Sequence, residues 1–333
     1  MTTSITRRSL LAATAAVATL ALGTQAAFAQ DKIKLRMATV ATESDSRTIA
    51  LAETFGPAVS EFAEYEPHYN GTLFKQATEL EAIARGNLEM AITSAQELAT
   101  FFPEFSILTA GYVHQSAEHQ VKVFNDPVMD PLKQKAEDEL NVKLLAVMYL
   151  GKRQLNLRGD QEVKTPADLA GVKLRMPGTD AWQFLGAALG ASPVPMAFGE
   201  VYTGLQTGAI DGQDNPLPTV VDSKFYEVTK QIVLTSHLVD LNYVAFSKSV
   251  FDSLTPEQQA TVVQAAEEAA EIARQVQLKK EEELVSFLTD QGLKIYEPDV
   301  AAFRDHVQAE YLASDYAKDW PEGMLERINE LGN

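Results

Sequence analysis

A long uninterrupted helical segment near the C-terminus is the sequence feature that most constrains the fold. Thr255 and Gln258 have the spacing of a capping box, and Pro256 occupies the first helical turn. Polar helix formers then continue, which predicts a single helix over residues 256–291, about 54 Å long at 1.5 Å per residue. Such a helix is longer than one domain is wide, so it would pack along two domains. Two helices with a break near Lys279 are the alternative interpretation.

Upstream of this helix, strand-like and helix-like periodicities alternate along the chain. Ile33, Leu35 and Met37 alternate with charged residues, a pattern typical of a half-buried strand. Residues 142–150 are almost wholly apolar, as expected of a strand covered on both faces in a parallel sheet. Further strands are expected over residues 90–92, 172–176 and 240–247, and helices over residues 51–62, 80–85, 181–189 and 200–206. This alternation predicts an α/β fold.

The N-terminal residues have the pattern of an export signal. Arg7 and Arg8 precede an apolar stretch over residues 10–22, and Ala-Phe-Ala at 27–29 is the small-x-small pattern that a signal peptidase cleaves. The apolar stretch is too short for a permanent membrane span. A retained anchor and a twin-arginine export signal are the alternatives. We therefore expect residues 1–29 to be a signal peptide and the mature protein to work in the periplasm.

The length of the mature chain predicts two domains. Cleavage after residue 29 leaves 333 − 29 = 304 residues, which usually form two hydrophobic cores. A second set of elements begins after Gly151, and the chain is expected to cross back later. We place domain I at residues 30–151 and 241–280, and domain II at residues 152–240 and 281–333.

The net charge narrows the classes of partner. The chain contains 46 acidic and 28 basic residues, which gives a formal charge of −18, and it contains no cysteine. A charge of this sign opposes binding to nucleic acid and to anionic lipid. A site for an anion in such a chain would need local, buried positive groups.

Motifs of catalytic and cofactor sites are missing from the sequence. There is no Gly-x-Ser-x-Gly elbow, no phosphate-binding loop and no Gly-x-Gly-x-x-Gly after a strand. The histidines are not spaced as metal ligands; His114 and His119, for example, are five residues apart. We therefore expect no metal and no cofactor, and we predict a binding protein and not an enzyme.

A series of motifs in the second half of the chain is specific to one family. The motifs are VKLRMP (172–177), LGASPVPMAF (189–198), EVY (200–202), LQTG (205–208), DGQDNP (211–216) and KFYEV (224–228). In this order they closely resemble the solute-binding proteins of tripartite ATP-independent periplasmic (TRAP) transporters, in the dicarboxylate-binder (DctP-like) group. The resemblance implies a periplasmic-binding-protein fold with two α/β domains, an interdomain cleft and a long helix that spans both.

The resemblance also implies which residues bind the ligand. In this family the arginine of the Lys-Leu-Arg-x-Pro strand pairs with the ligand carboxylate, and here it is Arg175. The arginine after the glycine at the domain crossover matches Arg153, the asparagine of Asp-Gly-Gln-x-Asn-Pro matches Asn215, and an aromatic residue that packs on the ligand matches Phe198. A guanidinium presents a planar fork of donors that a carboxylate meets with two parallel hydrogen bonds.

Four further residues are expected to bind the ligand, and three of them lie in segments where this chain departs from the sialic acid binders of the family or carries acidic residues. The sialic acid binders of the family bring another arginine to the ligand after the strand at 90–92, whereas this chain has Ser94 and Gln96 there. The loop after the first strand contains Glu43, which suits a hydroxyl or an amine better than a second carboxylate, and Asn242 lies in the strand expected over 240–247. We therefore expect a ligand with one anionic group and several hydroxyls, such as a sugar acid or a hydroxy acid.

The expected partners are a small organic acid and the membrane permease subunits of a TRAP transporter, without nucleic acid, and we expect the protein to be a monomer. Two other functions remain as alternatives. A periplasmic enzyme that acts on a small acid would turn its ligand over. A sensor would pass its ligand-bound form to a receptor.

Overall fold

The structure is a computed structural model that describes residues 32–332, and the predicted signal peptide lies outside the described residues. Its strands are β1 (Ile33–Ala38), β2 (Ala63–His68), β3 (Met90–Ser94), β4 (Val142–Leu157), β5 (Lys173–Met176), β6 (Ser192–Pro195), β7 (Gly212–Asn215), β8 (Gln231–Ser247) and β9 (Lys294–Tyr296). Its α-helices are α1 (Ser46–Ala50), α2 (Gly56–Val59), α3 (Glu79–Ala84), α4 (Ala95–Leu98), α5 (Ala117–Asn125), α6 (Asp130–Leu140), α7 (Asp180–Ala188), α8 (Val201–Thr207), α9 (Leu217–Asp222), α10 (Lys248–Asp252), α11 (Pro256–Asp290), α12 (Val300–Ala313), α13 (Tyr316–Asp319) and α14 (Met324–Leu331). Shorter turns of π or 3₁₀ helix are η1 (Leu51–Phe55), η2 (Pro103–Thr109), η3 (Pro127–Met129), η4 (Pro166–Leu169), η5 (Phe198–Glu200) and η6 (Phe225–Glu227).

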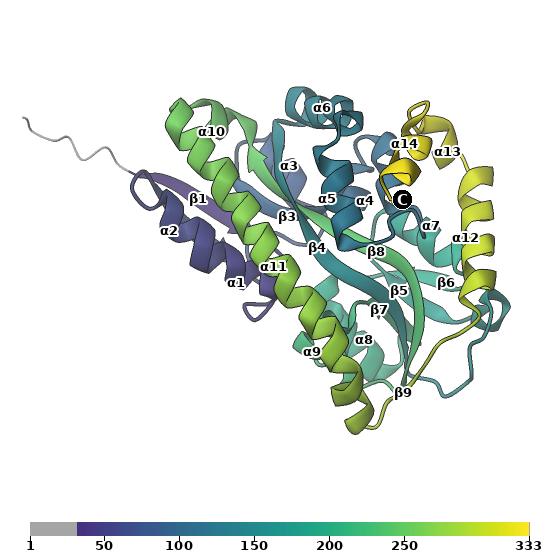
Figure 1. The fold of residues 1–333 in the computed structure, drawn as a ribbon. Coiled ribbons are helices and arrows are strands. Elements are labelled where there is room, and N and C mark those ends of the chain that lie inside the picture. Colours follow the sequence, from purple (N-terminus) through teal and green to yellow (C-terminus); the bar gives the residue numbers. More distant parts are fainter. Residues whose placement is uncertain (1–31, 333) are drawn as a thin grey trace, which may run out of the picture. The chain divides into compact units, whose positions relative to one another are not determined.

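All strands belong to one mixed sheet with the order β2-β1-β3-β8-β4-β7-β5-β6, and β9 pairs with β8. At one side β1 is parallel to β2 and β3, and at the other side β5 is parallel to β6 and β7. The long strands β4 and β8 join these two parallel groups through antiparallel pairing (Figure 1). The predicted α/β fold is therefore confirmed.

The two central strands are longer than the sequence pattern indicates. We expected strands over residues 142–150 and 240–247, but β4 continues through Gly151 to Leu157 and β8 begins at Gln231. The β4–β8 register shifts between Tyr149 and Gly151, where the Gly151 backbone has a φ of 129° that only glycine adopts readily. A bulge at this glycine lets one strand change direction without ending.

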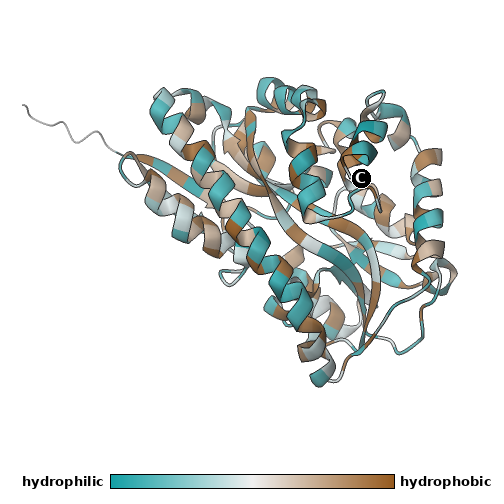
Figure 2. Ribbon diagram, viewed as in Figure 1, coloured by the Kyte–Doolittle hydropathy of each residue, from teal (hydrophilic) through white to brown (hydrophobic). Residues whose placement is uncertain are grey.

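The predicted long helix is confirmed as α11, a single α-helix of 35 residues without a break at Lys279. Its capping box forms as expected, because the Thr255 hydroxyl accepts from the Gln258 amide and the Gln258 side chain accepts from the Thr255 amide. Several alanines form part of its buried face, which lets the helix approach α1, α9 and β4 closely. Figure 2 shows hydrophilic and hydrophobic residues interspersed along α11.

Hydrophobic residues are buried on both faces of the sheet. One core contains α1, α2 and the first half of α11 against β1, β3 and β8, with Phe55, Phe246 and Ala266 fully buried. A larger core contains α3 to α7 and α12, and includes Trp182 and Phe303. None of the helices described between residues 32 and 332 combines the length and apolarity that crossing a membrane needs. The domain limits given above stay a prediction.

Candidate functional site

A polar cavity lies where the carboxyl ends of strands from both parallel groups approach the middle of β4 and β8. Loops outside the carboxyl ends of parallel strands are the usual ligand site in α/β proteins. The strands contribute Ser94, Arg153, Arg175, Asn215 and Asn242. The strands also contribute the apolar Ile92 and Leu150. The other lining residues come from the loops and helices around them: Thr39, Val40, Ala41, Thr42, Asp45, Arg47, Gln76, Glu97, Pro177, Trp182, Phe198, Thr219, Asp222 and Ser223.

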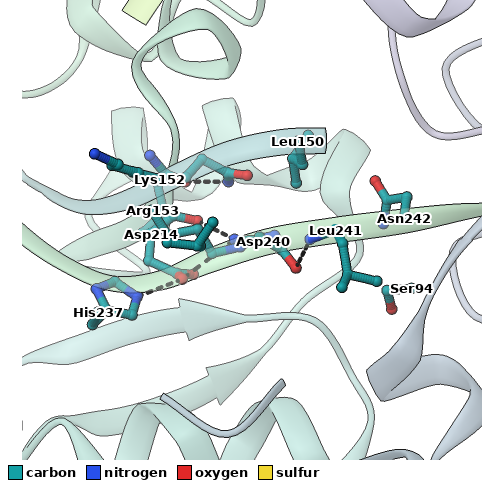
Figure 3. A network of polar contacts seen from close by, with 12 residues as sticks. Ser94, Leu150, Lys152, Arg153, Asp214, His237, Asp240, Leu241 and Asn242 are labelled. Atoms are coloured by element: carbon teal, nitrogen blue, oxygen red, sulfur yellow. Dashed lines mark hydrogen bonds and ion pairs between the residues drawn. The ribbon is translucent and has the colours of Figure 1, made fainter. Parts of the chain in front are cut away.

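Three buried arginines line this cavity, and Arg153 is held by an internal network of charges. Its Nε donates to Asp240 Oδ2 at 2.6 Å, and its Nη1 donates to the Asp214 main-chain oxygen at 2.7 Å and lies 3.3 Å from Asp214 Oδ2. Figure 3 shows this network, in which His237 Nε2 also contacts Asp214 Oδ2, at 3.1 Å. The Arg153 guanidinium lies 4.3 Å from the centre of the Trp182 ring. The charge of Arg153 is therefore already compensated by the protein.

Burial and charge act in opposite directions on the acids of this network. Burial raises the pKa of Asp214, but Arg153 and His237 more than offset this effect, and the net pKa is lowered. For Asp240, burial outweighs the attraction of Arg153, and the net pKa is raised. Both carboxylates come from strands next to β4 in the sheet, so the sheet itself fixes the position of Arg153.

The second arginine, Arg47, is paired with a neighbour in sequence. Asp45 caps α1 and also accepts two hydrogen bonds from the Arg47 guanidinium, at 2.9 and 2.7 Å. Arg47 Nη1 donates to the side-chain oxygen of Asn242 on β8. Burial raises the pKa of Asp45, but the charge and hydrogen bonds of Arg47 lower it by more, so the net pKa of Asp45 is lowered. The charge of Arg47 is also compensated.

The third arginine, Arg175, is the exception. Its side chain is 1% exposed, and it makes no ion pair with any residue described between 32 and 332. Its Nε donates to the main-chain oxygen of Met196 and its Nη2 to Gln76 Oε1, each at 2.9 Å. Burial lowers the pKa of Arg175 to about 9; the positive charge of Arg153 adds to this effect, and the more distant charges of Asp214 and Glu200 offset only part of it. A buried, charged guanidinium without a counter-ion is costly, and a carboxylate in the cavity would remove that cost.

Acidic groups line another part of the cavity. Glu97 accepts hydrogen bonds from Thr93 Oγ1 at 2.8 Å and from the Ser94 amide at 2.9 Å, and burial raises its pKa. Burial and the charge of Glu97 raise the pKa of the adjacent Glu79 to about 9. Burial also raises the pKa of Asp222, on α9, to about 6. A carboxyl group accepts hydrogen bonds from ligand hydroxyls, and when it is protonated it can also donate one.

Six of the eight residues expected to bind the ligand lie around this one cavity. They are Arg175, Arg153, Asn215, Phe198, Ser94 and Asn242. The other two are not in its lining: Glu43 is exposed in the loop after β1, and Gln96 is a buried residue of α4. The Phe198 ring centre lies 5.8 Å from the Arg175 guanidinium, and Asn215 Nδ2 donates to Gln213 Oε1 at 2.6 Å.

Several residues that line the cavity were not predicted from the sequence. Arg47 stands two residues after Asp45, so the sequence contained the signal for their ion pair. Gln76 and Asp222 carry no local signal, because their places in the cavity depend on segments far apart in the chain. Trp182 lies in a helix whose apolar pattern indicates only packing.

An α/β fold with a cavity lined by charged residues at strand ends is typical of a site that binds a small polar solute. The chain belongs to the bacterial extracellular solute-binding protein family 7, whose sequence profile matches residues 37–319. The predicted resemblance to TRAP transporter solute-binding proteins is thereby confirmed.

Solved structures and relatives agree with this family. A TRAP periplasmic solute-binding protein from Roseobacter denitrificans, solved with bound 3-deoxy-D-manno-oct-2-ulosonic acid (KDO), is 67% identical, with a TM-score of 0.90. That comparison covers 91% of this chain and 100% of the other. A second protein of this kind from the same species, with bound L-galactonate, is 29% identical with a TM-score of 0.82, over 91% of this chain and 99% of the other. The 2,3-diketo-L-gulonate-binding periplasmic protein YiaO of Escherichia coli is 29% identical over 98% of each chain. These three relatives are all binding proteins for sugar acids or related compounds.

Proposed function

We propose that this chain captures an eight-carbon sugar acid of the KDO type in the periplasm and delivers it to the membrane permease of a TRAP transporter. The observation that carries the proposal is Arg175, a buried cation without a counter-ion in a cavity whose other arginines are already paired. The relative with bound KDO, at 67% identity, supports this class of ligand over shorter acids.

The distribution of polar groups suits a ligand with one carboxylate and several hydroxyls. The carboxylate would take the donors of Arg175 that the protein leaves unused, with Phe198 against the same end of the ligand. The amides of Asn215 and Asn242 and the carboxyl group of Asp222 could exchange hydrogen bonds with the hydroxyls. In this arrangement the ion pair of Arg47 and Asp45 adds no net charge to the cavity and offers hydrogen-bond donors and acceptors to the ligand.

We propose that the ligand leaves unchanged. None of the histidines described between residues 32 and 332 lines the cavity, and the His237–Asp214 pair is fully buried with Asp214 already engaged by Arg153. A general base for enzymatic turnover must reach the substrate within hydrogen-bond distance. The buried pair therefore supports a role in holding Arg153 and not one in proton transfer to a ligand.

The test is calorimetric titration of the mature protein after unfolding and refolding to remove any carried-over ligand. We expect KDO to bind more tightly than L-galactonate, and an uncharged KDO amide to bind at least 100-fold more weakly than KDO. Mass spectrometry should recover the added acid unchanged. Equal affinity for acid and amide would contradict the assigned role of Arg175, and loss of the acid would contradict the absence of catalysis.

A further inference from the structure

Gln76 connects two parts of the chain across the mouth of the cavity. It lies between β2 and α3, and its Oε1 accepts from Arg175 Nη2 at 2.9 Å and from the Phe198 amide at 3.1 Å. These two donors are 99 and 122 residues away in the sequence. One side-chain oxygen thus holds the loop at 72–78 against β5 and η5.

Gln76 also separates the cavity from a second, outer pocket. It is the one residue in the described chain that lines both spaces. The outer pocket is bordered by Thr78, Thr100, Gly178 and Ala197 among others, so it adjoins the same two segments that Gln76 joins. Gln76 is therefore part of the wall that the two spaces share.

We propose that Gln76 is a gate residue that closes the cavity and matches it to a ligand with a single negative charge. The inference rests on the proposed function of the Arg175 site. A neutral amide oxygen satisfies one donor of the guanidinium without cancelling its charge, so one positive charge remains for the ligand. A carboxylate at this position would cancel that charge and take the place of the ligand.

The backbone next to Gln76 supports a gate that is held closed by its contacts. Ala77 has a φ of 69°, in the left-handed region that residues with a Cβ rarely adopt. Such a conformation persists when neighbouring contacts fix it, and it is found at segments that switch between states. The two hydrogen bonds of Gln76 are contacts of this kind, so breaking them would allow the loop to relax and open.

The outer pocket has a charge that favours retention of an anion behind the gate. Its lining includes Asp180, Glu200, Asp315 and Asp319, and it includes no basic side chain among the residues described. An anion would be repelled there and attracted by Arg175 inside. The gate therefore stands at the boundary between a repelling and an attracting environment.

The decisive variant is Gln76→Glu, which has nearly the same shape and adds one negative charge. We expect its affinity for KDO to fall at least 30-fold, and its preference for KDO over the uncharged KDO amide to fall by at least tenfold. Without ligand, its midpoint of thermal unfolding should rise, because the new carboxylate pairs with buried Arg175. Gln264→Glu, an exposed position on α11 outside both pockets, is the control for added charge and should leave all three values unchanged.

A second variant separates the gate from the charge effect. Gln76→Ala removes the contacts without adding charge, so the dissociation rate of KDO, followed by stopped-flow tryptophan fluorescence, should rise at least tenfold while the preference for acid over amide is kept. An unchanged dissociation rate of KDO in Gln76→Ala, or an unchanged preference for KDO over its amide in Gln76→Glu, would overturn the gate. Binding of KDO by the wild-type protein would still support the proposed function in that case. If the wild-type protein bound no sugar acid, the proposed function would fail. The ligand-free unfolding of Gln76→Glu would then still test its contact with Arg175.

Discussion

Replacing Arg175 with methionine should separate ligand binding from stability. A bidentate pair with a carboxylate contains two charge-assisted hydrogen bonds worth about 1.5–3 kcal/mol each. Their loss amounts to about 3–6 kcal/mol, or a dissociation constant raised by about 10²- to 10⁴-fold. Calorimetric titration with KDO measures this loss directly.

The same substitution should cost little or no stability in the ligand-free protein. Arg175 has no ion pair, so Arg175→Met removes a buried charge without a paired counter-ion. It loses the hydrogen bonds to Met196 and Gln76, at about 1 kcal/mol each, and the contact of the guanidinium with the Phe198 ring. The matched control is Arg153→Met, which leaves Asp214 and Asp240 buried without their cation and should lower the free energy of unfolding by about 3–5 kcal/mol. Urea unfolding of both variants compares them. Binding of KDO by Arg175→Met within threefold of wild type would refute the role of Arg175 in ligand binding. Easier unfolding of Arg175→Met than of Arg153→Met would refute the difference in charge compensation between the two arginines.

Two further predictions concern stability. The pKa of Glu79 is raised from its ordinary value of 4.5 to about 9, so the folded protein keeps a proton that the unfolded chain releases between these pH values, and wild-type stability falls as the pH rises. Glu79→Gln, which does not titrate, should therefore gain stability relative to wild type over this range in urea unfolding. A pH-independent difference between the two proteins would contradict the raised pKa. A Cβ on Gly151 would lie 2.6 Å from Pro216 Cβ and 2.7 Å from Glu281 Oε1, and the φ of 129° at this position disfavours a side chain. Gly151→Ala should therefore lower the free energy of unfolding by about 2–4 kcal/mol. The control Gly86→Ala has a positive φ but open space around it and should cost only about 1 kcal/mol; equal losses would argue against crowding at Gly151.

Local sequence patterns were sufficient for the long helix, for part of the sheet and for the family. The capping box at Thr255 and the length of polar helix that follows predict α11 within one residue at its C-terminal end. Strands β4 and β8 were predicted too short, because Gly151 normally marks a strand end and here occupies a bulge inside a continuous strand. A bulge depends on the partner strand, which a single sequence does not display.

The same limit applies to the candidate site. Motifs predict a ligand-binding role for both Arg153 and Arg175, but they do not reveal that Asp214 and Asp240 already pair with Arg153. That difference arises only when β7 and β8 are placed next to β4. Gln76 has no recognisable motif, because its role depends on contact with residues about 100 positions away.

The central position of β8 has a consequence for the order in which the protein can fold. The group β2-β1-β3, formed by the first third of the chain, reaches the rest of the sheet only through β8, which ends at Ser247. Sheet formation must therefore wait until most of the polypeptide is available, and contacts at such sequence separation make folding slow.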